Sequence, residues 1–184
     1  SGSSSGSSNS ATVVQSIVAS WVQVRKVQNF ITATTATTSA TRAVSKTLLI
    51  INRKEDYVQS IETLQETEII LIRILLCYHE SIGINIIFNH SLCIETIIIH
   101  VNRMLLFLKE EKEGRTEVVK DVAVVEEAFT IEKNERLLGI LCIELLCIGL
   151  KNKIQSIQYK LIKRNVYEKL MIIVTHYNQD KDTS

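Results

Sequence analysis

Proline is absent from this chain of 184 residues. Average usage would give about nine prolines in that length. Helix interiors exclude proline, whereas folds built of strands and turns use it at turns and edges, so its absence favours an all-helical protein. Aromatic residues are also scarce, at 5%, and the net charge is only +1. A chain with no excess of positive charge and no series of aromatic residues is not expected to bind nucleic acid.

Glycine is the next shortage, because the chain has only six glycines and they are scattered. No glycine-rich phosphate loop, no serine nucleophile elbow and no HExxH helix is present. The acidic stretches "KEEKEGRTE" and "VVEEAFTIEKNE" have the spacing of a solvated helix surface. We therefore predict a protein that is not an enzyme and that needs no cofactor.

Neither of two strongly apolar stretches is a long uncharged run. "IILIRILLCY" carries Arg73, and "LLGILCIELLCIGL" is only 14 residues long with Glu144 near its middle. Because a transmembrane helix needs about 20 mostly apolar residues, both stretches are predicted to be buried core helices. We expect no membrane span.

Apolar residues recur at spacings of three and four along most of the chain, as in amphipathic helices. "ETIIIHV" and "EKLMIIVTHY" have the composition of buried strands, but turn dipeptides are missing around them. We expect a flexible Ser/Gly segment over 1–10, N-terminal helices over 11–66 and a helical-repeat region over 67–184. The individual helices are expected at 11–31, 43–65, from a turn near Thr67 to about residue 79, 83–89, 92–113, from a cap at Thr116, 135–149 with a cap at Asn134, 154–163, and 166–178 with Asn165 and Glu168 forming a start like a capping box.

Two stretches of the chain are similar to each other. "RILLCYHESIGINIIFNHSLCIETIIIHV" begins at Arg73, and "ELLCIGLKNKIQSIQYKLIKRNVYEKLMIIV" begins at Glu144. Each contains an apolar helix, a polar loop, a short amphipathic helix, a sharp break and another apolar helix. With three extra residues in the second loop, the pairs are 75–77 with 145–147, Phe88 with Leu161, Glu95 with Glu168, Ile97 with Leu170, and Val101 with Val174. Stacking one copy on the other would bury a continuous core.

The pattern resembles the armadillo/HEAT class of helical repeats. "ERLLGILCIELLCIGLKNKIQSIQYKLIKRNVYEKLMIIVTHYN" looks like the third helix of one armadillo unit followed by the first two helices of the next, and "TEIILIRILLCYHESIGINIIFNHSLCIETIIIHV" looks similar. The final stretch is also similar to the SAPS-domain phosphatase regulatory subunits, which implies a subunit that holds a phosphatase catalytic chain. Asn165 and the region of Ser91 and Leu92 stand where armadillo units usually have glycine. The copies are also about 70 residues apart, whereas an armadillo unit has about 40–47.

The cysteines are Cys77, Cys93, Cys142 and Cys147, all in apolar segments. We expect reduced, buried thiols and a cytoplasmic protein. Burial raises a thiol pKa, so we do not expect a catalytic cysteine. A weaker alternative is a metal site formed by Cys77, His79, His90 and Cys93, with His100 nearby. On a helix, however, the first two of these side chains point in roughly opposite directions.

Basic residues gather near the C-terminal end. Residues 151–174 contain six lysines and arginines and one acidic residue, Glu168. Such an asymmetry can steer an acidic partner to one end of a protein, although an ordinary solvated surface is the simpler interpretation. We take Lys153, Lys160, Lys163 and Arg164 as the candidate partner-binding residues.

Together these patterns predict an all-α, irregular armadillo/HEAT-like helical repeat (an α-solenoid), with an irregular helical bundle as the structural alternative. The expected function is that of a non-enzymatic scaffold, adaptor or structural subunit of a larger protein assembly. Its stacked helices would bind other protein subunits. The alternative is a helical metal-binding protein or enzyme that uses the Cys/His group at 77–100.

Overall fold

The chain is all-helical in every part that the computed structural model describes, which comprises residues 6–39, 47–78, 81–112, 122–152, 158, 159, 163 and 165–182. No strand occurs among these residues, so the predicted all-α class is confirmed. The helices are α1 (Gly6–Ser39), α2 (Thr47–Cys77), α3 (Ser81–Asn89), α4 (Ser91–Lys112), α5 (Val122–Lys151) and α7 (Val166–Asp182).

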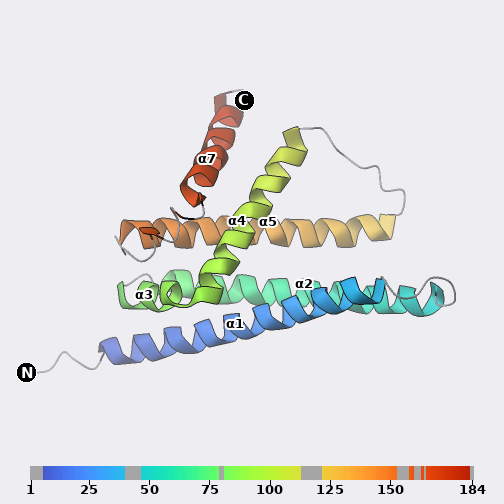
Figure 1. Cartoon of the computed structure of the whole chain (residues 1–184), viewed down its shortest axis with the longest axis horizontal. Coiled ribbons are helices and arrows are strands. Elements are labelled where there is room, and N and C mark those ends of the chain that lie inside the picture. Colours follow the sequence, from blue (N-terminus) through green and yellow to red (C-terminus); the bar gives the residue numbers. More distant parts are fainter. Residues whose placement is uncertain are drawn as a thin grey trace, which may run out of the picture.

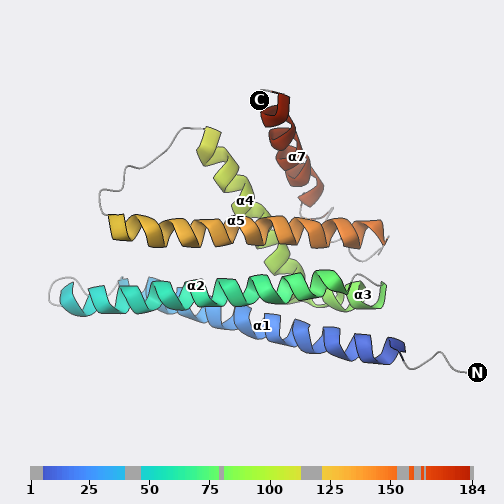
Figure 2. The same ribbon diagram turned by 180° about the vertical axis from the view of Figure 1, so that it is seen from behind.

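Three long helices lie side by side, with α2 between α1 and α5 (Figures 1 and 2). Helix α1 runs antiparallel to α2, whereas α5 runs parallel to it. Helix α4 starts beside α3, crosses α5 and also contacts α1. Helix α7 packs against α4 and runs away from the end of α5, in a direction similar to that of α4.

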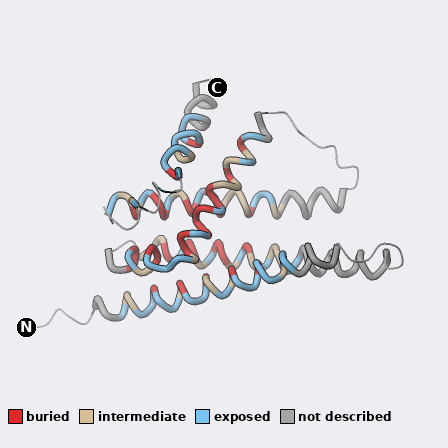
Figure 3. The backbone as a smooth tube through the Cα atoms, viewed as in Figure 1, coloured by how far each residue is buried: buried red, intermediate tan, exposed pale blue. Residues whose placement is uncertain are grey.

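The core lies where α1, α2, α4 and α5 meet, and the buried residues gather there (Figure 3). In α1, one stripe at spacings of four and three is buried: Val14, Val18, Trp21, Arg25 and Gln28. That spacing places side chains on one face of a helix. Burying each large apolar side chain contributes about 1.5–3 kcal/mol, so this stripe determines which face of α1 packs on α2.

Helix α4 passes close to α5 at Gly139, in the middle of α5. A Cβ atom added there would lie 3.2 Å from the Cβ of Met104 and 3.5 Å from the backbone oxygen of His100. Contacts shorter than 3.4 Å are tighter than most real Cβ contacts. The missing side chain therefore lets the two helices cross at this distance.

Several predicted boundaries are correct. The helices predicted at 83–89, 92–113 and 166–178 correspond to α3, α4 and α7. Asn165 precedes α7 with a φ of 54°, a left-handed conformation that asparagine tolerates. Its carbonyl accepts from the backbone N–H of Lys169, and Glu168 lies in the first turn as expected. Thr116 and most of the helix predicted at 154–163 lie outside the described residues.

Two predicted interruptions are wrong. Thr67 does not mark a turn, because α2 runs on from Thr47 to Cys77 and the Thr67 hydroxyl donates to the Thr63 carbonyl at 2.8 Å. Asn134 does not begin a helix, because it is buried inside α5. The flexible segment predicted at 1–10 is wrong from Gly6 onward, where α1 already begins. Extending an existing helix is easier than starting one, so a helix continues through residues that form helices weakly.

The two similar stretches lie against each other. Helix α2 contacts α5, and α4 contacts both α5 and α7. Positions 69, 72 and 75 of α2 are buried, and so are positions 139, 142 and 145 of α5, which lie 70 residues further on. Helices α2 and α5 thus share a burial pattern and a helix direction.

Among the described residues, one segment meets the length and composition of a membrane span, namely Ser91–Lys109 in α4. It is not one of the two apolar stretches from which no membrane span was expected. Half of it, 50%, is buried inside the fold, and the core helix of a soluble protein passes the same test. It is weak evidence for a membrane.

Candidate functional site

A buried carboxylate, Glu68 of α2, lies at the centre of a polar cluster between four helices. The indole Nε1 of Trp21 donates to its Oε1 at 2.9 Å, and the amide Nε2 of Gln28 donates to its Oε2 at 3.3 Å. The guanidinium of Arg25 lies 3.5 Å from the same Oε2 and also donates to Gln28. These three partners follow one another at spacings of four and three, so one face of α1 carries all of them toward α2.

His100 of α4 lies between two carboxylates. Its Nε2 is 3.1 Å from Oε1 of Glu68, and its Nδ1 is 3.4 Å from Oε2 of Glu135 in α5. The second contact has the distance of an ion pair but not the direction of a good hydrogen bond, and both atoms lack another partner. Because ionised carboxylates only accept hydrogen bonds, both ring nitrogens must carry protons to satisfy them. The arrangement therefore favours the imidazolium form of His100.

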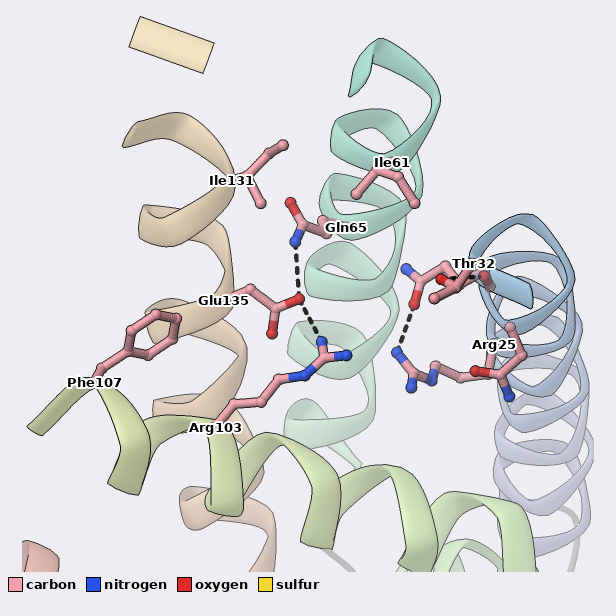
Figure 4. Close-up of a pocket in the computed structure, with 10 residues that line it drawn as sticks. Arg25, Thr32, Ile61, Gln65, Arg103, Phe107, Ile131 and Glu135 are labelled. Atoms are coloured by element: carbon pink, nitrogen blue, oxygen red, sulfur yellow. Dashed lines mark hydrogen bonds and ion pairs between the residues drawn. The ribbon is translucent and has the colours of Figure 1, made fainter. Parts of the chain in front are cut away.

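Glu135 is held by two further donors. Arg103 of α4 donates to its Oε1 at 2.6 Å, and the amide of Gln65 in α2 donates to the same atom at 2.9 Å (Figure 4). We call the five ionisable residues the charged network; they are Arg25, Glu68, His100, Arg103 and Glu135. The network connects α1, α2, α4 and α5.

The network shifts the acid–base properties of its members. Burial alone would raise the carboxyl pKa values, but the hydrogen bond and charge of His100 outweigh burial and lower the pKa of Glu68 and, to about 2, that of Glu135. Arg25 assists at Glu68, and Arg103 assists at Glu135. Burial would lower the pKa of His100, but its contacts with the two carboxylates raise it. All three residues are thus stabilised in their charged forms.

A cavity of about 450 Å³ opens beside the network, between α1, α2, α4 and α5 (Figure 4). Ile61, Phe107 and Ile131 form part of its apolar wall, and Thr32 lies on α1. The polar lining consists of Arg25, Gln28, Asn29, Gln65, Arg103 and Glu135. Arg103 and Glu135 face each other across the space between α4 and α5 (Figure 4).

Three polar atoms of this lining are buried without a hydrogen-bond partner. One is Oε2 of Glu135, which has only its ion-pair contact with His100; the other two are the guanidinium Nε of Arg25, a donor, and the side-chain Oε1 of Gln65, an acceptor. Arg25 and Gln65 are both more than nine-tenths buried. An unsatisfied buried polar group costs about 1–3 kcal/mol, so these atoms gain from a ligand or water that supplies the missing partner.

The residues of the predicted metal site differ in exposure. Cys77 and His90 are exposed, whereas Cys93 is buried, and His79 lies outside the described residues. Burial and the charge of Glu68 raise the pKa of Cys93 to about 12, so its thiol holds its proton firmly. Within the described parts of the chain, no group of three or more His, Cys, Asp and Glu residues is arranged to hold a metal ion.

The prediction of reduced, buried thiols is correct in part. All four cysteines are free thiols, but Cys77 and Cys147 are exposed rather than buried. Each occupies a solvent-facing position of its apolar helix, which the composition of the segment does not reveal. Of the predicted basic edge, Lys163 is an exposed helical residue, whereas Lys153, Lys160 and Arg164 lie outside the described residues.

Sequence analysis missed the charged network, although one signal was present. Glu68 lies four residues before Ile72 and seven before Leu75, on the buried stripe of α2. His100 lies between Ile97 and Met104 on the buried stripe of α4. A charged residue at a core position needs a partner, so each of these was a sign of a buried pair.

Comparison with known proteins adds no relative. No family model matches the chain, and neither a curated protein nor a solved structure matches it.

Proposed function

We propose that this chain is a helical-repeat scaffold of irregular armadillo/HEAT-like type, without catalytic activity, and that it binds a partner protein through the outer face of α7. The proposal is supported by the side-by-side, parallel arrangement of α2 and α5 and by the similar directions of α4 and α7 (Figures 1 and 2). A stack of this kind needs a polar outer face where it ends.

The single observation that carries the proposal is a difference between α4 and α7. In α4, Ile94, Ile98 and Val101 are all buried, with exposed fractions of 5% or less. The residues 73 positions further on, in α7, are Tyr167, Met171 and Val174, with exposed fractions of 38%, 65% and 52%. Positions that are covered in α4 are therefore open in α7.

The exposed residues of α7 form one stripe, because they follow one another at spacings of four and three. Ile172, the residue after Met171, is also exposed. Contiguous apolar surface on a helix is typical of a protein-binding site. The matching partner is an amphipathic helix that packs its apolar side on α7, as the second copy packs on α4. Lys163, exposed just before α7, favours acidic residues at one end of that helix.

A pull-down from native extract with three forms of the chain tests this. Met171→Lys places a charge in the centre of the α7 stripe, and Ile70→Lys places the same charge at a similarly exposed apolar position of α2. We expect a stoichiometric partner to be captured by the wild type and by Ile70→Lys but lost with Met171→Lys. Equal capture by all three forms would show that the α7 stripe is not the binding surface. Circular dichroism confirms that both variants are folded.

A further inference from the structure

The cavity beside the charged network lies on other elements than the α7 stripe, and the proposed scaffold does not use it. Its volume of about 450 Å³ falls in the range of small-molecule sites, which is about 300–1,000 Å³. It also has the usual composition of such sites, with an apolar wall and a few polar groups at fixed positions. Its chemistry can be deduced from its charges and its unpartnered atoms.

The charged network has a surplus of positive charge. Arg25, Arg103 and the imidazolium of His100 supply three positive charges, and Glu68 and Glu135 supply two negative charges. His100 is fully buried, and Arg25 and Arg103 both line the cavity. One uncompensated positive charge beside the cavity favours a ligand with one negative charge.

The unpartnered atoms of the lining add a second requirement. The Nε of Arg25 needs an acceptor, which a carboxylate supplies. The Oε1 of Gln65 needs a donor and would be unfavourable beside a bare anion. A ligand that satisfies both atoms carries a carboxylate and a hydroxyl or amide N–H close to it.

The apolar wall gives a third requirement. Ile61, Phe107 and Ile131 line the cavity from α2, α4 and α5 (Figure 4). A ligand with a compact apolar group buries that group against these side chains. Inorganic phosphate lacks such a group and at neutral pH carries more than one charge.

We propose that this cavity binds a small monoanionic organic acid, with its carboxylate at Arg25 and Arg103, a neighbouring hydroxyl or amide donor at Gln65, and its apolar part against Phe107 and the two isoleucines.

Three related probes test the proposal on the full chain by isothermal titration calorimetry. Mandelate has the carboxylate, the hydroxyl and an apolar ring; phenylacetate lacks the hydroxyl; mandelamide lacks the charge. We expect saturable binding of mandelate, binding about 5-fold weaker for phenylacetate because one hydrogen bond is lost, and binding at least about 10-fold weaker for mandelamide. No saturable binding of mandelate, or equal binding of all three probes, would overturn the proposal.

Two variants connect binding to this cavity. Gln65→Met keeps the size of the side chain and removes the acceptor, together with the amide that donates to Glu135, so mandelate should lose its advantage over phenylacetate. Arg103→Gln should weaken both acids by about 10-fold, whereas Arg73→Gln, which removes a charge from an exposed position of α2, should leave both unchanged. If Arg103→Gln does not fold, the Gln65→Met result decides alone. An undiminished preference for mandelate in Gln65→Met would overturn the assignment.

Discussion

In the proposed repeat, the first unit (α2, α3 and α4) and the second unit (from α5 to α7) have different residue types at corresponding buried positions. Glu68 and His100 are both fully buried in the first unit. The positions 70 and 73 residues further on, in the second unit, are Leu138 and Ile173, which are also buried. A charged pair thus stands in one unit where the other has two aliphatic residues.

The difference shows that the charged pair is not what makes this arrangement of helices possible. Desolvating two charges is costly, and a well-packed apolar pair is often as stable as a buried ion pair or more so. What the charges add is specificity, because Glu68 accepts only when donors from α1 and α4 reach it. The first unit is in this way connected to α1 on one side and, through His100 and Glu135, to α5 on the other.

Breaking the charged pair from one side is expected to have the largest effect. Glu68→Ala leaves Arg25, His100 and the indole N–H of Trp21 buried without their acceptor. We expect the free energy of unfolding to fall by about 3–5 kcal/mol in urea denaturation followed by circular dichroism. The control Glu144→Ala removes an exposed carboxylate from α5 and should change it by less than about 0.5 kcal/mol. A loss of less than about 1 kcal/mol for Glu68→Ala would mean that the network contributes little.

The open face of the second unit is tested by a matched pair of truncations. Ile98→Ala removes a buried side chain from α4 and should cost about 2–5 kcal/mol. Met171→Ala, at the corresponding position of α7, removes an exposed one and should cost less than about 0.5 kcal/mol in the isolated chain. The two costs are measured by the same urea denaturation. Similar costs for the two variants would show that α7 is covered in solution.

Another paired position also differs between the two proposed units. Helix α5 has Gly139 where α4 crosses it closely, and α2 has Ile69 at the corresponding position. Gly139→Leu improves the helix propensity of α5 by about 1 kcal/mol but places a side chain against Met104 and the backbone of His100. We expect the steric effect to dominate, with a net loss of about 1–3 kcal/mol and a lower melting temperature. Ile140→Leu, at the exposed neighbouring position, serves as the control. A rise in stability for Gly139→Leu would contradict the close crossing.

The smallest effect on stability is expected from a change of pH, because titration changes a charge and leaves every heavy atom in place. His100 has a raised pKa, so its stabilisation is complete below its ordinary value of 6.5 and is lost as the pH rises through the raised value. Glu68 and Glu135 have lowered pKa values, so their stabilisation is complete above 4.5 and is lost as the pH falls, for Glu135 through about 2. The contribution of the network is therefore largest between about pH 4.5 and 6.5.

The measurement is the free energy of unfolding from below pH 4.5 to well above pH 6.5, for the wild type and for His100→Gln. Cys93 and Cys142 have raised thiol pKa values because they are buried, so they stay protonated and do not confuse the profile. We expect the decline of stability above pH 6.5 to be smaller in His100→Gln. An unchanged decline would assign it to other groups.

Local sequence signals predicted the helices best where the chain offers clear breaks. The bounds of α3 and α4 follow from the short polar junctions that flank them, and both were predicted to within a few residues. Thr67 and Asn134 misled because these residue types are common at helix ends. In α2, however, the Thr67 hydroxyl bonds back to the preceding turn, and in α5 Asn134 is buried. Neither outcome can be read from neighbours in the sequence.

The candidate sites show a similar division. The exposed stripe of α7 has the same apolar pattern as the buried stripe of α4, and only the presence or absence of a covering helix distinguishes them. The charged network joins residues that lie 32 to 43 positions apart along the chain. The apolar spacing around Glu68 and His100 was a signal that they are buried, but which residues would pair with them could not be read without the packing.

The sequence by itself determined that this chain is helical and that two of its stretches are alike, because proline content and apolar spacing act within single helices. The tertiary structure alone decided which polar residues are buried together, since a charge is tolerated in a core only where distant helices bring its partners within hydrogen-bonding distance. It also decided which apolar stripe is left open, because burial depends on what lies opposite a helix face.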